Sequence, residues 1–222
     1  MRAVVLLSGG QDSATCLAWA KRRFAQVWAM SFDYGQRHRI ELEAAARIAG
    51  LAGVEAHRVL KVGELADLGG NALTGEATVE ETAAPGRLPN TFVPGRNLLF
   101  LTLAGAWAWQ LGAASLVAGV CQTDYSGYPD CRQGTMEALQ EALRRGLDAP
   151  DMTIHAPLMH LTKAQSVVLA RDLGALDLLA HSHTCYNGAV PPCGRCPACH
   201  LRAKGFAEAG VADPLLVRLG VA

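Results

Sequence analysis

The sequence lacks an excess of charge of either sign. Its 222 residues include 20 lysines and arginines and 20 aspartates and glutamates, so the formal net charge at pH 7 is zero. Proteins that bind a long nucleic acid usually carry a basic excess, because their affinity comes largely from contacts with phosphates. A nucleic-acid partner is therefore not expected.

The sequence also lacks a hydrophobic run long enough to cross a membrane. A span needs about 20 apolar residues, and the longest candidate, residues 98–109, is short and interrupted by Thr102 and Gly105. Residues 1–3 lead directly into an apolar segment, so no secretory signal is expected. We predict a cytoplasmic protein without a membrane partner, whose seven cysteines are reduced or metal-bound rather than paired in disulfides.

Apolar runs alternate with helical patterns along most of the chain. The runs predict strands at residues 3–7, 27–32, 56–60, 115–120 and 153–156. Helical spacing predicts helices at residues 13–23, 39–49, 98–111, 133–145 and 163–173. This alternation is typical of an α/β protein with a doubly wound parallel sheet. We expect an α/β domain over residues 1–180 and a cysteine-rich segment with a C-terminal helix packed on it over residues 181–222.

A glycine-rich loop, Ser8-Gly9-Gly10-Gln11-Asp12-Ser13, joins the first predicted strand to the first helix. Free N–H groups and the positive end of the helix dipole meet at such a helix start and favour a phosphate group. The loop has neither the lysine of G-x-x-x-x-G-K-[ST] nor the spacing of G-x-G-x-x-G. Taken alone, it is also compatible with a tight strand-to-helix turn. Asp12 is a candidate Mg²⁺ ligand or a helix cap.

Four cysteines lie within fifteen residues near the C-terminus, in a segment rich in proline and glycine. They are Cys185, Cys193, Cys196 and Cys199. Four thiolates at this spacing fit one tetrahedral metal ion, and zinc suits that ligand set best. With every coordination position filled, the zinc would be structural. An iron–sulfur cluster and a chance group of thiols are the alternatives.

A polar loop at residues 119–132 combines tyrosines, carboxylates and an arginine. The tyrosines suit stacking on a flat heterocycle, and a carboxylate suits the N1–H and exocyclic amine of a guanine-like ring. An ordinary surface loop is the alternative. The candidate substrate-binding residues are Asp124, Tyr125, Ser126, Tyr128, Asp130 and Arg132.

For the other candidate residues, the sequence is compatible with two different locations or roles. Arg96 opens a predicted helix and either meets an anion or lies on the surface. Lys163, also near a helix start, reaches either the site or the solvent. Cys121 and Cys131 are either nucleophiles or small buried side chains.

These signals, in this order, resemble the 7-cyano-7-deazaguanine synthase family of ATP pyrophosphatases. The matching stretches are Ser8–Ser13, Asp33–His38, Asn71–Thr74, Thr91–Phe100, Gly119–Arg132, Cys185–Gly188 with the three later cysteines, and Leu201–Phe206. Gln133 departs from the pattern, because many members have an acidic residue there; its role would pass to Asp124 or Asp130.

The resemblance implies a ligase of queuosine biosynthesis that uses ATP, with Mg²⁺, and ammonia to convert a deazaguanine carboxylate to a nitrile. The carboxylate would be adenylated, converted to an amide, activated again and dehydrated. A structural zinc and a homodimer are also implied. The implied catalytic residues are Asp12, Ser13, Arg96 and Arg132. The implied ATP-binding residues are Leu7, Ser8, Gly9, Gly10, Gln11, Asp12, Ser13, Ala14, Thr15, Cys16 and Leu17.

Two other functions are compatible with parts of the sequence. A pyrophosphatase that modifies tRNA, for example by thiolation, would share the loop but would usually need a basic RNA-binding appendage. A regulator that binds ATP without splitting it would not need the tyrosine–aspartate loop. The zero net charge and the polar loop count against these two alternatives respectively.

Overall fold

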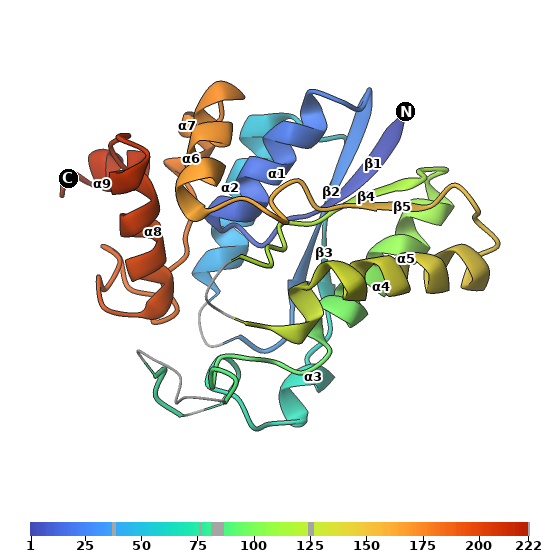
Figure 1. Cartoon of the computed structure of the whole chain (residues 1–222), viewed down its shortest axis with the longest axis horizontal. Coiled ribbons are helices and arrows are strands. Elements are labelled where there is room, and N and C mark those ends of the chain that lie inside the picture. The colour runs from blue at the N-terminus through green and yellow to red at the C-terminus, as the bar shows by residue number, and fades with distance from the viewer. Residues whose placement is uncertain (37–38, 76, 81–86, 124–126, 222) are drawn as a thin grey trace.

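The computed structural model describes residues 1–36, 39–75, 77–80, 87–123 and 127–221 (Figure 1). Its centre is a sheet of five parallel strands in the order β3-β2-β1-β4-β5. The strands are β1 (Arg2–Leu6), β2 (Gln26–Asp33), β3 (His57–Lys61), β4 (Ser115–Val117) and β5 (Thr153–His155). The chain winds outward from β1 in both directions, which confirms the predicted doubly wound sheet.

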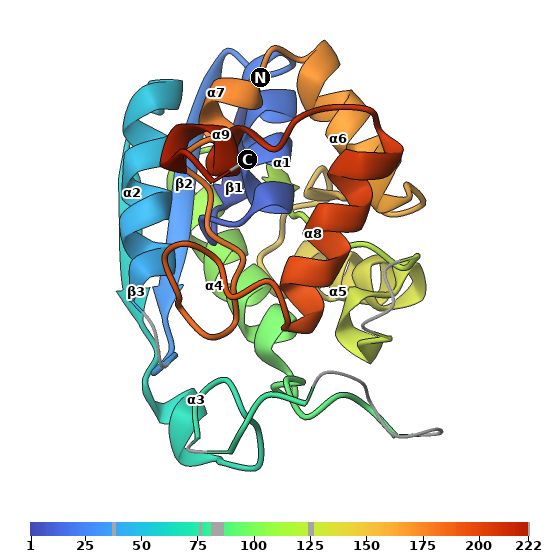
Figure 2. The ribbon, with the colours of Figure 1, turned by 90° about the vertical axis from the view of Figure 1, so that its left-hand side faces the viewer.

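Helices cover both faces of the sheet (Figures 1 and 2). One face carries α1 (Gln11–Lys21), α2 (Ile40–Ala52), α6 (Lys163–Asp172) and α7 (Leu176–Leu179). The other carries α4 (Arg96–Gln110) and α5 (Gln133–Gly146). The remaining helices are α3 (Glu64–Asp67), the 3₁₀ turn η1 (Pro129–Cys131), α8 (Pro197–Glu208) and α9 (Pro214–Leu219). In the part of the chain described, no helix is both long and apolar enough to cross a membrane.

The apolar side chains of β1 alternate between two buried cores. Ala3 and Val5 pack with α1, α2 and α6 on one face, whereas Val4 packs with α4 and α5 on the other. Both faces of the central strand are buried, so it reads as a continuous apolar run rather than an alternating one. This pattern explains why the first strand was predictable.

The C-terminal helices close one side of the molecule (Figure 2). α8 packs along α6, and Phe206 of α8 belongs to the core that contains α1. Arg202 of α8 forms two hydrogen bonds of 2.6 and 2.7 Å with the carboxylate of Asp213, which also caps α9. The C-terminal segment therefore contains two helices where one was expected, and the first of them begins at Pro197 and includes Cys199. The proposed division at residue 180 stays a prediction.

Several element bounds differ from those expected. The structure adds α3, α7 and η1, which are too short to show a helical period in the sequence. α1 begins at Gln11 rather than Ser13. β4 ends at Val117 rather than Val120. Beyond it, Gly119 lies so close to α1 that a Cβ atom there would be 3.1 Å from the backbone nitrogen of Ser13.

Candidate active site

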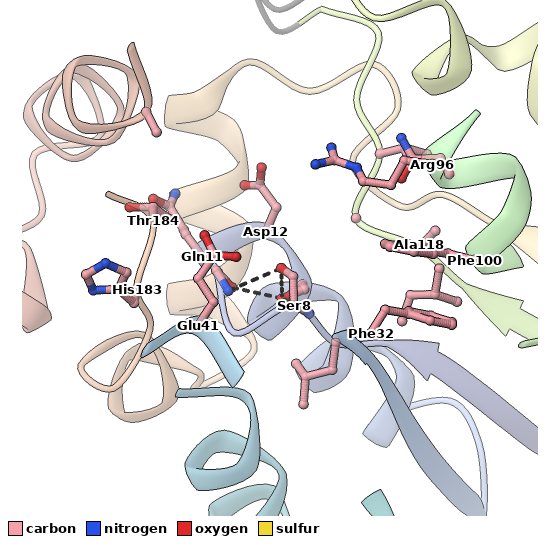
Figure 3. A pocket seen from close by; sticks show the side chains of 18 of the residues that line it. Ser8, Gln11, Asp12, Phe32, Glu41, Arg96, Phe100, Ala118, His183 and Thr184 are labelled. Carbon is pink, nitrogen blue, oxygen red and sulfur yellow. Dashed lines mark hydrogen bonds between the residues drawn. The ribbon is translucent and has the colours of Figure 1, made fainter. Parts of the chain in front are cut away.

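A cavity of about 320 Å³ opens beyond the carboxyl ends of the strands (Figure 3). Its walls come from the loop after β1, the end of β2, the first turns of α2 and α4, the segment after β4 and the segment before α8. The loops after β1 and β4 leave the sheet where the strand order reverses, and ligands of open parallel sheets bind at this place.

The glycine-rich loop after β1 is held by its own serines. Ser13 Oγ accepts a hydrogen bond of 3.2 Å from the backbone N–H of Ser8 and donates one of 3.0 Å to the carbonyl oxygen of Gly10. The two serine hydroxyls are 3.1 Å apart. The loop therefore keeps its shape without a ligand and presents the first turn of α1 to the cavity.

Gly9 allows two other segments to approach the loop. Its φ is +87°, and a Cβ atom there would lie 2.2 Å from the carbonyl oxygen of Glu41 and 2.8 Å from the nitrogen of Ala45, both in α2. On its other side, the N–H of His183 donates a 2.8 Å hydrogen bond to the carbonyl oxygen of Gly9. The loop is thus fixed between α2 and the cysteine-rich segment.

Asp12 projects into the cavity from the first turn of α1. Its Oδ2 accepts a 2.8 Å hydrogen bond from Lys163 Nζ of α6, so Lys163 reaches the site rather than the solvent. Asp12 Oδ1 is buried, as are Gln11 Nε2 and Thr184 Oγ1, and none of these three atoms has a hydrogen-bond partner among the described residues. Buried polar atoms without partners are costly. They indicate a polar ligand or a cation at this place.

Arg96 enters the cavity from the opposite wall, at the start of α4 (Figure 3). Its Nη1 is 3.4 Å from the hydroxyl oxygen of Tyr34, and within the described chain it forms no ion pair with a carboxylate. Burial opposes its charge, but the phenols of Tyr34, Tyr128 and Tyr186 outweigh this effect and raise its pKa. A permanently charged, largely buried guanidinium that has no carboxylate partner among the described residues is a site for an anion.

A flat apolar wall lies at the end of β2. The rings of Phe32 and Phe100 are stacked with their centroids 4.0 Å apart and their planes 4° apart, and both line the cavity. Such a surface suits the face of a heterocyclic base.

The structure brings part of the predicted site together. Among the predicted ATP-binding residues, those that line the cavity are Leu7, Ser8, Gly10, Gln11, Asp12 and Ser13. Gly9 supports the loop from behind, and residues 14–17 are buried inside α1. Tyr128 lines the cavity, and its hydroxyl is 2.6 Å from Thr91 Oγ1. The predicted Asp124, Tyr125 and Ser126 lie outside the described residues.

Asp130 and Arg132 do not line the cavity. Asp130 is buried, and its Oδ2 accepts a 3.1 Å hydrogen bond from the backbone N–H of Asn97 at the start of α4. Asp130 therefore fixes the helix end that carries Arg96. Arg132 is exposed and caps α5. The predicted contacts of these two residues with substrate stay predictions.

Sequence reasoning missed Glu41, Thr184 and Tyr186, which all line the cavity. Thr184 and Tyr186 are the direct neighbours of Cys185 in the chain, so the cysteine motif could have pointed to them. Glu41 lies in the first turn of α2, shortly after the polar segment at residues 33–36. Nothing in a lone glutamate on a helix marked it as part of the site.

The four cysteines meet as expected. The Sγ atoms of Cys185, Cys193, Cys196 and Cys199 all lie within 4.8 Å of one another, and those of Cys193 and Cys199 are 3.9 Å apart. Sulfurs bound tetrahedrally to zinc at about 2.3 Å are about 3.8 Å apart. Backbone N–H groups of Cys193 and Cys196 donate to neighbouring sulfurs of the cluster, as thiolates require. The donor set therefore fits a metal ion.

Solved structures with similar folds include a 4-thiouridine synthetase–RNA complex with bound ATP, with a TM-score of 0.54 and 16% identity over 99% of this chain. This chain spans about half of that longer one, 53%. NMN synthetase from Francisella tularensis gives a TM-score of 0.53 at 16% identity, covering 99% of this chain and 82% of that one. At these identities the likeness concerns the fold alone.

Comparison by sequence is far closer. The 7-cyano-7-deazaguanine synthase of Laribacter hongkongensis (strain HLHK9) is 61% identical over 219 residues, which cover 98% of this chain and 95% of the relative. That of Chromobacterium violaceum is 60% identical over 221 residues, covering 98% and 94%. Residues 2–210 match the model of the family described as queuosine biosynthesis protein QueC. The chain belongs to the QueC family.

Proposed function

We propose that this protein uses ATP and ammonia to convert 7-carboxy-7-deazaguanine to 7-cyano-7-deazaguanine. The observation that carries the proposal is the cavity of this family member, whose walls bring together the glycine-rich loop, the guanidinium of Arg96 and the stacked rings of Phe32 and Phe100. The loop suits a polyphosphate, the guanidinium suits an anion, and the stacked rings suit a flat heterocycle.

In the first step, a carboxylate oxygen of the substrate attacks the α-phosphate of ATP, and pyrophosphate leaves. The loop at residues 8–13 and the start of α1 hold the leaving pyrophosphate, while Lys163 lies close enough to contribute a positive charge. Arg96 holds the substrate carboxylate and the charge that develops at the α-phosphate. Catalysis consists mainly of positioning and charge stabilisation.

Two metals belong to the proposal. Mg²⁺ suits the unpartnered Oδ1 of Asp12, and when bound with ATP it would neutralise phosphate charge. Zinc suits the four-cysteine cluster. The segment that zinc would stabilise carries Thr184 and Tyr186 into the cavity wall. The proposed role of the zinc is therefore structural, although its site lies next to the cavity.

The test is an incubation of purified protein with ATP, Mg²⁺, ammonium and 7-carboxy-7-deazaguanine, followed by mass spectrometry. The expected product carries a nitrile in place of the carboxylate and forms only when ATP is present. No product from zinc-loaded protein that binds ATP would overturn the proposal, and tRNA would then be the next substrate to test.

We also propose a cytoplasmic homodimer. The absence of a membrane-length helix in the described residues is compatible with that location, and exposed apolar side chains such as Trp109 offer surface for a second copy. Light scattering coupled to size-exclusion chromatography measures the oligomeric state; a monomer at micromolar concentration would contradict a stable dimer.

A further inference from the structure

Glu41 is a carboxylate in the wall of the cavity without a side-chain partner among the described residues. Within the described residues, the carboxylates that line the cavity belong to Asp12 and Glu41. Asp12 forms an ion pair with Lys163, whereas Glu41 has no hydrogen bond or ion pair to a described side chain. The backbone of Glu41 lies against Gly9, so its position relative to the glycine-rich loop is fixed.

Glu41 and Arg96 enter the cavity from different walls. In the view of Figure 3, the Asp12 side chain lies between Arg96 on one side and Glu41 with Thr184 on the other. The two opposite charges of Glu41 and Arg96 sense one another without forming an ion pair. Both residues line the same cavity, so a reacting group held by Arg96 would share that cavity with the Glu41 carboxylate.

The surroundings of Glu41 shift the pKa of its carboxyl group upward, toward neutral pH. Burial raises its pKa to about 7, and the positive charge of Arg96 partly opposes that rise. The other titratable groups that sense its charge are Tyr34 at the end of β2 and Tyr186 in the cysteine-rich segment. Both phenols have pKa values raised by burial, so they remain neutral and do not compete for its proton.

The proposed reaction must remove protons from nitrogen twice. Ammonium first loses one proton to give ammonia. Ammonia then attacks the adenylated carboxylate, a C–N bond forms, the C–O bond to AMP breaks, and nitrogen loses a second proton to give the amide. The amide oxygen then displaces pyrophosphate from a second ATP. As the C–O bond to this AMP breaks, nitrogen loses its last two protons and the C≡N bond forms.

We propose that Glu41 is the general base that accepts a proton from nitrogen in both AMP-releasing steps. Its carboxylate takes one proton each time and returns it to solvent, while the second proton leaves to water. This inference rests on the proposed function. A base that titrates near the working pH is the most effective kind, because it is both sufficiently ionised and sufficiently basic.

The test uses the Glu41→Gln variant and starts from the isolated amide, 7-carboxamido-7-deazaguanine, with ATP and Mg²⁺. No ammonia is needed in this half reaction, so the titration of ammonium does not distort the pH profile. For the unchanged protein we expect nitrile formation to rise with pH and level off above about pH 7. For Glu41→Gln we expect a loss of about 10²- to 10⁴-fold and no break near pH 7.

Two further measurements separate a base from a binding or folding role. Single-turnover pyrophosphate release from the carboxylate, without ammonia, precedes both deprotonations and should stay within about threefold in Glu41→Gln. Glu43→Gln, an exposed change on the same helix, should behave like the unchanged protein in every assay.

Three outcomes would decide the matter. An equal loss of pyrophosphate release in Glu41→Gln would overturn the proposal in favour of a binding role. A retained break near pH 7 would also overturn it. If the unchanged protein forms no nitrile from either substrate, the proposed function itself fails, which is a result distinct from the other two.

Discussion

Asp12 occupies the position where the glycine-rich loop, α1 and α6 meet. One of its carboxylate oxygens is neutralised by Lys163 at 2.8 Å, and the other is buried without a partner among the described residues. This arrangement is poor for stability, because a partly buried ion pair gains little once desolvation is counted. It is well suited to a site where nucleotide phosphates and a cation arrive together.

Replacing Asp12 with Ala should therefore reduce activity far more than stability. We expect ATP-dependent pyrophosphate release to fall about 100-fold or more, since a preorganised charged group is lost, while the metal content of the cysteine cluster is unchanged. Kinetics, metal analysis and thermal melting measure the three effects. Asp151→Ala, an exposed change, is the control. Turnover within threefold of the unchanged protein would refute the role of Asp12.

Replacing Glu41 with Gln should reduce activity but increase the stability of the folded protein. The pKa of Glu41 in the folded state, about 7, lies above its ordinary value of 4.5 because the side chain is buried. The stability associated with its protonated form is complete below pH 4.5 and is lost as the pH rises through 7. Glu41→Gln cannot ionise, so we expect it to be more stable than the unchanged protein by about 1–3 kcal/mol at pH 8.

This difference should nearly vanish at pH 4.5, where Glu41 is protonated in the folded protein and about half protonated in the unfolded chain. Urea unfolding followed by tryptophan fluorescence at the two pH values measures it. A stability difference that is the same at pH 4.5 and pH 8 would show that packing rather than ionisation causes it.

At the scale of elements, the sequence was most informative where one segment carries the whole signal. The strand, loop and helix at residues 2–21 were predictable because an apolar run, two glycines and a helical pattern follow one another. The capping box at Thr162 and Gln165 was recognisable in part, since Thr162 directly precedes the helical pattern.

Contacts between distant elements could not be predicted in this way. Lys163 meets Asp12, 151 residues away, only because α6 packs on α1. Tyr186 reaches the surroundings of Arg96 because the cysteine-rich segment folds back over the sheet edge. Asp130 accepts a hydrogen bond from the backbone at the start of α4, a contact that its neighbours in the sequence do not indicate. Each of these positions depends on packing that no local pattern encodes.

The close approach of the glycine-rich loop to α2 predicts that Gly9 tolerates no larger residue. A Cβ atom there would overlap the backbone of α2 and would also require an L-residue at a φ of +87°. We expect Gly9→Ala to lower the free energy of unfolding by about 2 kcal/mol or more and to abolish ATP binding. Denaturant unfolding and calorimetry with ATP measure both effects.

Gly50→Ala is the matched control, because Gly50 lies in α2 with nothing within 4 Å of an added Cβ atom. This change should stabilise the protein by about 0.5–1 kcal/mol through helix propensity and leave ATP binding unchanged. Equal behaviour of the two variants would mean that the close approach at Gly9 has no consequence.

At the scale of the whole molecule, the cysteine-rich segment closes the active site rather than standing apart from it. Its apolar contacts are few and consist largely of the cysteines themselves with Tyr186, Ala189 and Ala198. A metal ion bound to the four clustered cysteines would supply stability that so small a core lacks. The segment also donates the hydrogen bond from His183 to Gly9, so its order and the order of the glycine-rich loop are connected.

Replacing Cys196 with Ser should therefore have effects beyond the cluster. We expect the metal content to fall from one zinc per chain to nearly none, the melting temperature to drop, and ATP affinity to weaken as the contact at Gly9 loosens. Metal analysis, visible absorbance and calorimetry with ATP measure these changes, and absorbance also distinguishes zinc from an iron–sulfur cluster. Cys131→Ser, outside the cluster, should keep its zinc. A Cys196→Ser protein that loses its metal yet binds ATP as before would show that the two regions are independent, and the segment would then be a separate structural unit.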